Sequence, residues 1–148
     1  MDARDPGAGA PDDTEPRPLS GYRLLVVDDQ PDARELMVAM LTAAGAEVES
    51  AASAADALHM LDTMSPDALL ADIGMPGSDG YSLIREVRRR DLPGGRHLPA
   101  AAITAYAGDH DRDRAVAAGF DCHVPKPVSR AAIVSAVRTI CRAQDRTS

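Results

Sequence analysis

Short apolar runs alternate with longer amphipathic segments from residue 21 onward. Continuous apolar runs of four to six residues are typical of strands that are covered on both faces of a sheet. Apolar residues that recur at helical spacing predict amphipathic helices between those strands. The predicted strands span residues 24–27, 47–50, 68–71, 99–104 and 121–124. The predicted helices lie at 31–44, after Ser53, around 83–90, at 111–118 and after Ser129.

Local signals mark several helix ends. Pro31 suits the first turn of a helix, and Gly45 suits its end. Within that first helix one apolar stripe is expected to face the core, formed by Leu36, Met37, Met40 and Leu41. The basic run at 88–90 suits the negative end of the third helix. We expect these arginines to be solvated, with a docking patch for a kinase as the alternative.

Five strands alternating with five helices predict an α/β fold with a doubly wound parallel sheet, (βα)5. Right-handed crossover connections place the carboxyl ends of all five strands on one edge of such a sheet. Ligands bind at that edge in open α/β sheets. The residues that follow each strand are therefore the candidates for function.

The chain length of 148 residues fits a single domain. Residues 1–20 are rich in proline and poor in large apolar side chains, which predicts a disordered N-terminal tail. The folded domain is expected to span residues 21–148.

Charge and composition exclude several classes of function. The net charge is −7 and Lys126 is the only lysine, so binding to nucleic acid or to anionic membranes is disfavoured. Two cysteines are too few for a disulfide framework and suit reduced thiols. Neither a membrane span nor a signal peptide is evident, so the expected location is cytoplasmic.

Polar side chains follow four of the predicted strands. Asp28 and Asp29 come after the first strand, Asp72 after the third, Thr104 ends the fourth, and Lys126 lies just past the fifth. Because these strand ends share one edge, three acids, a hydroxyl and an amine should converge. Carboxylate oxygens together with waters and phosphate oxygens are the ligands that Mg²⁺ prefers. One carboxylate beside such an ion can act as a nucleophile towards a phosphoryl group.

Each of these residues also has an ordinary structural explanation. Asp28 or Asp29 can cap the helix that begins at Pro31, and Asp72 can form a turn. Thr104 suits a strand, and Lys126 suits an exposed surface. The functional interpretation rests on their common position at one sheet edge.

Four stretches of the sequence resemble the response-regulator receiver domains of two-component signalling. They are LLVVDDQ (24–30), ALLADIGMPGSDGY (68–81), AAITAYA (101–107) and AAGFDCHVPKP (117–127). The resemblance spans nearly all of 21–148 and implies a flavodoxin-like fold. DIGMPG and ITAYA resemble the corresponding stretches in the receivers of hybrid histidine kinases. With only AQDRTS after residue 142, we expect either a single-domain regulator or the receiver of a hybrid kinase.

The resemblance implies a role for each acid. Asp72 matches the phosphoacceptor of the family. Asp28 and Asp29 match its Mg²⁺ ligands, together with Asp72 and the backbone carbonyl of Gly74.

It also implies roles for the residues around the phosphoryl group. Thr104 and Lys126 match the phosphate-contacting pair, and the backbone N–H of Ala105 faces the same group. Tyr106 matches the aromatic switch position, so the switch residues are expected to be Thr104 and Tyr106. The Lys126–Pro127 peptide bond is expected to be cis.

The function that follows is a phosphorylation-dependent signalling switch. A sensor histidine kinase or a histidine phosphotransfer protein would supply the phosphoryl group. A downstream protein would bind the face formed by the fourth helix, the fifth strand and the fifth helix. On this reading the chain is not an enzyme beyond its own phosphoryl transfer and dephosphorylation.

Two alternatives belong to other classes. A small Mg²⁺-dependent phosphatase with an Asp nucleophile commonly carries an acid two residues after that Asp, where this chain has Gly74. A flavin or nucleotide binder would need a glycine-rich or hydroxyl-rich loop after the first strand, where this chain has Asp28-Asp29-Gln30-Pro31.

Overall fold

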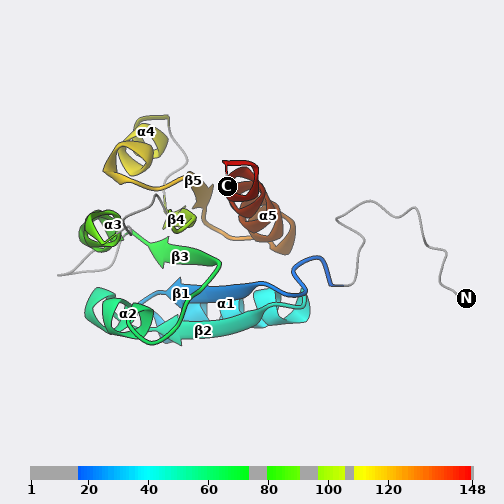
Figure 1. The fold of residues 1–148 in the computed structure, drawn as a ribbon. Helices are drawn as coiled ribbons and strands as arrows, with labels where there is room; N and C mark the ends of the chain where they lie inside the picture. Colours follow the sequence, from blue (N-terminus) through cyan, green and yellow to red (C-terminus); the bar gives the residue numbers. More distant parts are fainter. Residues whose placement is uncertain (1–16, 74–79, 91–96, 106–108, 148) are drawn as a thin grey trace, which may run out of the picture.

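Five parallel strands form a single sheet, as predicted, and the structure shows their order to be β2-β1-β3-β4-β5 (Figure 1). The computed structural model describes residues 17–73, 80–90, 97–105 and 109–147, with side chains left out at 109–111 and 142–147. The strands are β1 (Arg23–Val27), β2 (Glu47–Ala51), β3 (Ala68–Asp72), β4 (Ala100–Thr104) and β5 (Cys122–Pro125). The helices are α1 (Pro31–Ala43), α2 (Ala54–Leu61), α3 (Gly80–Arg89), α4 (Asp109–Ala118) and α5 (Arg130–Thr147).

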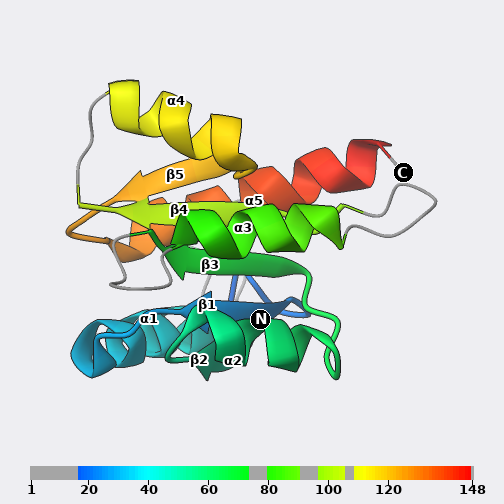
Figure 2. The same ribbon diagram turned by 90° about the vertical axis from the view of Figure 1, so that its left-hand side faces the viewer.

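Helices cover both faces of the sheet, which explains the continuous apolar strands. Leu24 and Val26 of β1 pack into the core beneath α1 and α5. Leu25 and Val27 point the other way, into the core beneath α2, α3 and α4. Figures 1 and 2 show these two layers on opposite sides of the sheet. Alternate residues of one strand thus serve two cores, as expected for a doubly wound sheet.

The local signals at helix ends act as predicted. Ser53 caps α2, since its hydroxyl accepts a hydrogen bond from the backbone N–H of Asp56 at 3.1 Å. Ser129 accepts one from the N–H of Ala132 at 3.1 Å, at the start of α5. Gly45 follows α1 with φ of +106°, a conformation that favours glycine. Within the described residues, no helix is both long enough and apolar enough to cross a membrane.

The apolar stripe predicted for α1 is only partly buried. Met37 and Leu41 are buried in the core, but the Leu36 residue is 57% exposed. The prediction for Leu36 is therefore wrong. The stripe is narrower than the spacing indicates, because successive residues on a helix point about 100° apart and α1 meets the sheet along one line.

The predicted disordered tail is too long at its C-terminal end. Residues 18–21 form turns, and Leu19 is fully buried. Its backbone N–H donates to the carbonyl of Ala44 at 2.8 Å, which fixes it against the end of α1. Leu19 alone is enough to hold this polar segment against the domain, because its side chain fills the core beside the end of α1. The preceding residues, 1–16, lie outside the described residues.

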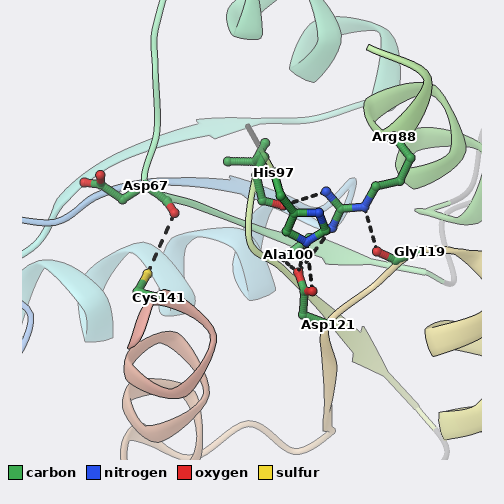
Figure 3. A network of polar contacts seen from close by, with 8 residues as sticks. Asp67, Arg88, His97, Ala100, Gly119, Asp121 and Cys141 are labelled. Carbon is green, nitrogen blue, oxygen red and sulfur yellow. Dashed lines mark hydrogen bonds and ion pairs between the residues drawn. The ribbon is translucent and has the colours of Figure 1, made fainter. Parts of the chain in front are cut away.

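The basic run at the end of α3 is not simply solvated, and Arg88 is only 17% exposed along its side chain. Its guanidinium donates to the carbonyls of Gly119 at 2.8 Å and Leu98 at 2.7 Å, and to the Asp121 carboxylate at 3.2 Å (Figure 3). Asp121 also accepts from the N–H of Ala100 at 2.8 Å and lies 2.9 Å from His97 Nε2. Arg88 thereby joins the end of α3 to the beginnings of β4 and β5.

The remaining two arginines have different surroundings. Arg90 reaches α2, where it donates to the Leu58 carbonyl and the Asp62 carboxylate, both at 3.3 Å. Arg89 is exposed and pairs with Glu86 on the same helix. The alternative of a three-arginine docking patch is therefore not supported, since two of the three side chains hold α3 against neighbouring elements.

Both cysteines are free thiols. Cys141 of α5 is buried, and its Sγ donates to the carbonyl of Asp67 at 3.7 Å (Figure 3). Burial raises the pKa of the Cys122 thiol to about 11, with a smaller contribution from the charge of Asp121. Cys122 is therefore protonated at neutral pH and acts as a small packing residue.

Leu41 and Leu36 of α1 allow a test substitution at a buried leucine to be compared with a control substitution at an exposed one. Leu41→Ala should lower the free energy of unfolding by about 2–5 kcal/mol, because it opens a cavity in the core. Leu36→Ala should change that free energy by less than about 0.5 kcal/mol, because no packing is lost at an exposed site. Urea unfolding followed by circular dichroism measures both. Equal losses in the two variants would mean that α1 packs through a wider face than described.

Arg88 and Arg89 offer a second pair. Arg88→Ala should lower the free energy of unfolding by about 1–3 kcal/mol, because two carbonyls and the Asp121 carboxylate lose a charged donor. Arg89→Ala should leave it nearly unchanged, because Arg89 is itself exposed and pairs with Glu86 on the same helix. The same urea titration compares the two. A larger loss for Arg89→Ala would overturn this assignment.

Candidate functional site

Three carboxylates from two neighbouring strands meet at the carboxyl edge of the sheet. Val27 is in register with Ala71 in the parallel β1–β3 pair, so Asp28 follows beside Asp72. Ligand oxygens of Asp28, Asp29 and Asp72 all lie within 4.8 Å of one another. The sequence prediction that these acids converge is confirmed.

Asp28 is the most deeply buried of the three acids, with no exposed surface. Its Oδ1 accepts a hydrogen bond from the backbone N–H of Gln30 at 2.9 Å. Its Oδ2 is buried and has no hydrogen-bond partner among the described residues. Burial is the main cause that raises the pKa of Asp28 above its ordinary value, and the hydrogen bond from the Gln30 N–H is the main effect that opposes it. The charge of Asp72 raises this pKa further, and the charges of Lys126 and Asp29 lower and raise it by smaller amounts.

The alternative that an aspartate caps α1 is wrong. The N-cap residue is Gln30, and its side chain makes no capping hydrogen bond. Pro31 stands at the first helical position, where its missing N–H costs nothing. Asp28 and Asp29 are therefore not needed to begin this helix, which leaves their carboxylates to face Asp72.

Asp72 faces the single lysine of the chain. Lys126 Nζ lies 3.2 Å from Asp72 Oδ2, and the side chains are 35% and 6% exposed respectively. Lys126 reaches this position because its backbone N–H donates to the carbonyl of Thr104 at 2.7 Å, which extends the β4–β5 pairing by one step. The peptide bond between Lys126 and Pro127 is cis, as predicted.

Thr104 ends β4 at the same edge and is buried, with 1% of the residue exposed. Strand pairing places Asp72 opposite Ile103, so Thr104 stands one residue beyond the acid along the neighbouring strand. Ala105 follows and is exposed. The predicted roles of Gly74 and Tyr106 fall on positions outside the described residues.

Gly80 is a residue of this site whose role the sequence patterns do not reveal. A Cβ added there would lie 2.7 Å from the Cα of Ile73 and 2.8 Å from the carbonyl oxygen of Asp72. Such contacts are too short for a real side chain, so only glycine lets α3 begin against the end of β3. One feature of the sequence could have pointed to this role. Glycine has a low helix propensity, and yet Gly80 stands at the start of a helix.

Arg34 is a second residue of this site whose role the sequence patterns do not reveal. Its guanidinium donates to the backbone carbonyl of Asp28 at 2.9 Å. Nothing in the sequence marks an arginine in the second turn of a helix as different from a surface residue.

The donor set fits a hard divalent cation. Three carboxylates offer oxygen atoms within reach of one another, and one of those oxygens is buried and lacks a partner. An unpaired buried carboxylate oxygen is costly, and a cation bound to oxygen ligands removes that cost. The cluster can therefore hold a metal ion beside Asp72.

Comparisons with known proteins show relatives that match most of this chain. A protein of Leptolyngbya boryana described as an uncharacterized 14.6 kDa protein in the sodA1 3' region is 43% identical over 125 residues, which cover 84% of this chain and 94% of that protein. The probable histidine kinase 2 of Oryza sativa subsp. indica is 31% identical over 145 residues, but the match covers only 14% of its length.

A solved structure is similar over most of both chains. The crystal structure of a putative response regulator from Chloroflexus aurantiacus J-10-fl matches with a TM-score of 0.75 and 34% identity, covering 82% of this chain and 98% of that one. The sequence model described as the response regulator receiver domain matches residues 24–138. These matches support the receiver interpretation and not the phosphatase alternative. The chain therefore belongs to the response regulator receiver domain family of two-component systems.

Proposed function

We propose that this receiver domain accepts a phosphoryl group on Asp72 from the phosphohistidine of a histidine kinase or a histidine phosphotransfer protein. The observation that carries the proposal is the contact between Asp72 and Lys126, beside a cluster of acids with one unpaired buried oxygen. Similarity to a probable histidine kinase supports the class of partner. Two thiols without a disulfide between them suit the cytoplasm as the proposed location.

In the proposed reaction, a carboxylate oxygen of Asp72 attacks the phosphorus atom. The new O–P bond replaces the P–N bond, whose electron pair returns to the imidazole nitrogen of the donor histidine. Asp28, Asp29, Asp72 and the Gly74 carbonyl would hold Mg²⁺, which supplies positive charge for the phosphoryl oxygens. Lys126 supplies a second positive charge, and water later hydrolyses the acyl phosphate.

Phosphorylation would then act as a switch through Thr104. The phosphoryl group adds negative charge and acceptor oxygens at the strand edge. The Thr104 hydroxyl and the Ala105 N–H would donate to those oxygens and draw in the end of β4, which biases the position of α4.

The proposed partner surface is the face of α4, β5 and α5. Of the α4 residues whose side chains are described, 112–118, only Ala115 is buried. Val116 on the same helix is 51% exposed. A helix with so little buried apolar surface is easily displaced, and an exposed valine offers a partner an apolar contact.

A small phosphodonor such as acetyl phosphate, supplied with Mg²⁺, tests the acceptor directly. Wild-type protein should gain the mass of one phosphoryl group in intact-protein mass spectrometry, and Asp72→Asn should gain none. Lys126→Gln should slow the gain about a hundredfold, the usual effect of losing one charge-stabilising donor. Asp113→Asn, an exposed acid on α4, is the control and should behave like wild type.

Two results would contradict the proposal. Equal phosphorylation of Asp72→Asn would place the acceptor elsewhere. Repeated turnover of a generic phosphomonoester by wild-type protein would favour the phosphatase instead.

The acidic cluster makes a separate prediction about stability. In the absence of divalent cations at neutral pH, Asp28→Asn should raise the free energy of unfolding by on the order of 1 kcal/mol, because it removes a buried charge that faces two others. Added Mg²⁺ should stabilise wild type more than Asp28→Asn. Thermal unfolding with and without Mg²⁺ measures both effects.

The sign of the pH dependence follows from the direction of the pKa shift. The folded pKa of Asp28 is raised, so the cost of its charge is full above that folded pKa and vanishes below the ordinary value of 3.8. The advantage of Asp28→Asn should therefore shrink as the pH falls towards 3.8. An advantage that persists unchanged at low pH, or a destabilised Asp28→Asn at neutral pH, would show that charge is not the cause.

A further inference from the structure

Arg34 contacts the acidic cluster from outside it. It lies on α1, one turn after the residue that begins the helix, and its backbone N–H donates to the carbonyl of Gln30 at 2.9 Å. Its side chain turns back to the end of β1, where the guanidinium donates to the carbonyl oxygen of Asp28 at 2.9 Å. Arg34 is half-buried, so water does not fully compete for this hydrogen bond.

Three hydrogen bonds fix Asp28, and each comes from a different direction. Its backbone N–H donates to the carbonyl of Ala51 on β2 at 3.1 Å. Its carbonyl accepts from Arg34 on α1, and its Oδ1 accepts from the N–H of Gln30 in the loop between. With both backbone groups and one carboxylate oxygen held, the remaining oxygen, Oδ2, is the one left unpaired and buried.

The hydrogen bond from Arg34 is the only one of the three that depends on a side chain outside the acidic cluster. The other two donors and acceptors belong to backbone or to Asp28 itself, so almost any sequence would supply them. Hydrogen bonds from a charged donor are shorter and stronger than neutral ones, and a guanidinium stays charged at every physiological pH. The Arg34 guanidinium also places a permanent positive charge next to Asp28, whose carboxylate lies within reach of two other acids.

We infer that Arg34 is a positioning residue of the metal site. It holds the Asp28 main chain so that Oδ2 remains directed at the place where the cation binds. The inference rests on the proposed function, since it assigns Arg34 to the same Mg²⁺ site. Partners of this kind, one step removed from the metal, typically change metal affinity by about tenfold or more when they are lost.

Titration with Mg²⁺ by isothermal calorimetry tests the inference without any phosphoryl transfer. Arg34→Ala should weaken Mg²⁺ binding about tenfold, and Arg34→Lys should recover part of the loss because lysine keeps a charged donor. Arg23→Ala is the matched control: it removes an exposed arginine paired with Glu47 at the opposite end of β1, and should bind Mg²⁺ like wild type.

A second measurement uses the metal-free protein. If Arg34 orders the loop, the Gln30 amide should exchange with deuterium faster in Arg34→Ala than in wild type, as followed by NMR. Core amides such as that of Leu70 should be unaffected, which separates a local change from general destabilisation. Should Arg34→Ala fail to fold, Arg34→Gln removes the charge while keeping a donor, and should weaken Mg²⁺ binding to a smaller extent.

The possible outcomes separate this inference from the proposed function. Wild-type affinity in both Arg34→Ala and Arg34→Gln, with unchanged exchange at Gln30, would overturn the positioning role and leave Asp72 as the acceptor. If wild-type protein itself binds no Mg²⁺ while Asp72 is still phosphorylated, the metal site fails and the role of Arg34 fails with it. If Arg34→Lys binds no better than Arg34→Ala, a charged donor is not what matters.

Discussion

The balance of charge at the carboxyl edge of the sheet is the constraint on which the rest of this structure depends. Asp28 and Asp72 are both buried, and both lie within reach of Asp29. Burial and the neighbouring carboxylates raise the pKa of Asp28 and so oppose its ionisation. Among the described residues, the positive charge that contacts these carboxylates directly is Lys126, at 3.2 Å from Asp72. One lysine cannot offset three acids, so the cluster has the charge and the oxygen ligands to hold a cation.

The fold tolerates this repulsion because the carboxylates come from the ends of rigid strands. Asp28 and Asp72 follow adjacent parallel strands whose apolar residues fill two cores. The packing of those cores fixes how close the acids can stand, and the acids cannot relax apart without disturbing the sheet. The stability of the cores thus supports an arrangement of acids that is unfavourable by itself and that can hold a metal ion.

Sequence patterns predicted the fold and the convergence of the residues at the strand ends for one physical reason. Parallel strands with right-handed crossovers bring their carboxyl ends together, so Asp28, Asp72, Thr104 and Lys126 could be placed from their positions in the chain alone. Leu36 and Leu19 show the limit of that reasoning. Whether an apolar residue is buried depends on how a helix is rotated against the sheet and on which segment happens to fill a gap, and neither is encoded in local spacing.

Long side chains were the other source of error. Arg88 and Arg34 reach carbonyl groups 31 and 6 residues away in the chain, and such contacts exist only once the fold has formed. An arginine at a helix end or in a second turn has no local signature that separates these roles from a solvated surface. Gly80 is similar, because the need for glycine arises from the close approach of the Asp72 carbonyl oxygen.

The helices α3 and α4 are held to the rest of the domain to different extents, and this difference indicates which of them would move after a change at Asp72. Five residues of α3 are buried, and Arg88 and Arg90 tie its end to β4, β5 and α2. By contrast, α4 buries Ala115 among its described side chains, and its Arg114 guanidinium lies 4.4 Å from the centre of the Tyr81 ring of α3. Within the described part of α4, a buried Ala115, a partly buried Ala118 and a contact between a cation and a ring hold the helix less firmly than the apolar face of α3 is held. Thr104 ends β4, the strand that precedes α4 in the chain. We therefore expect a charge added at Asp72 to displace α4 more readily than α3.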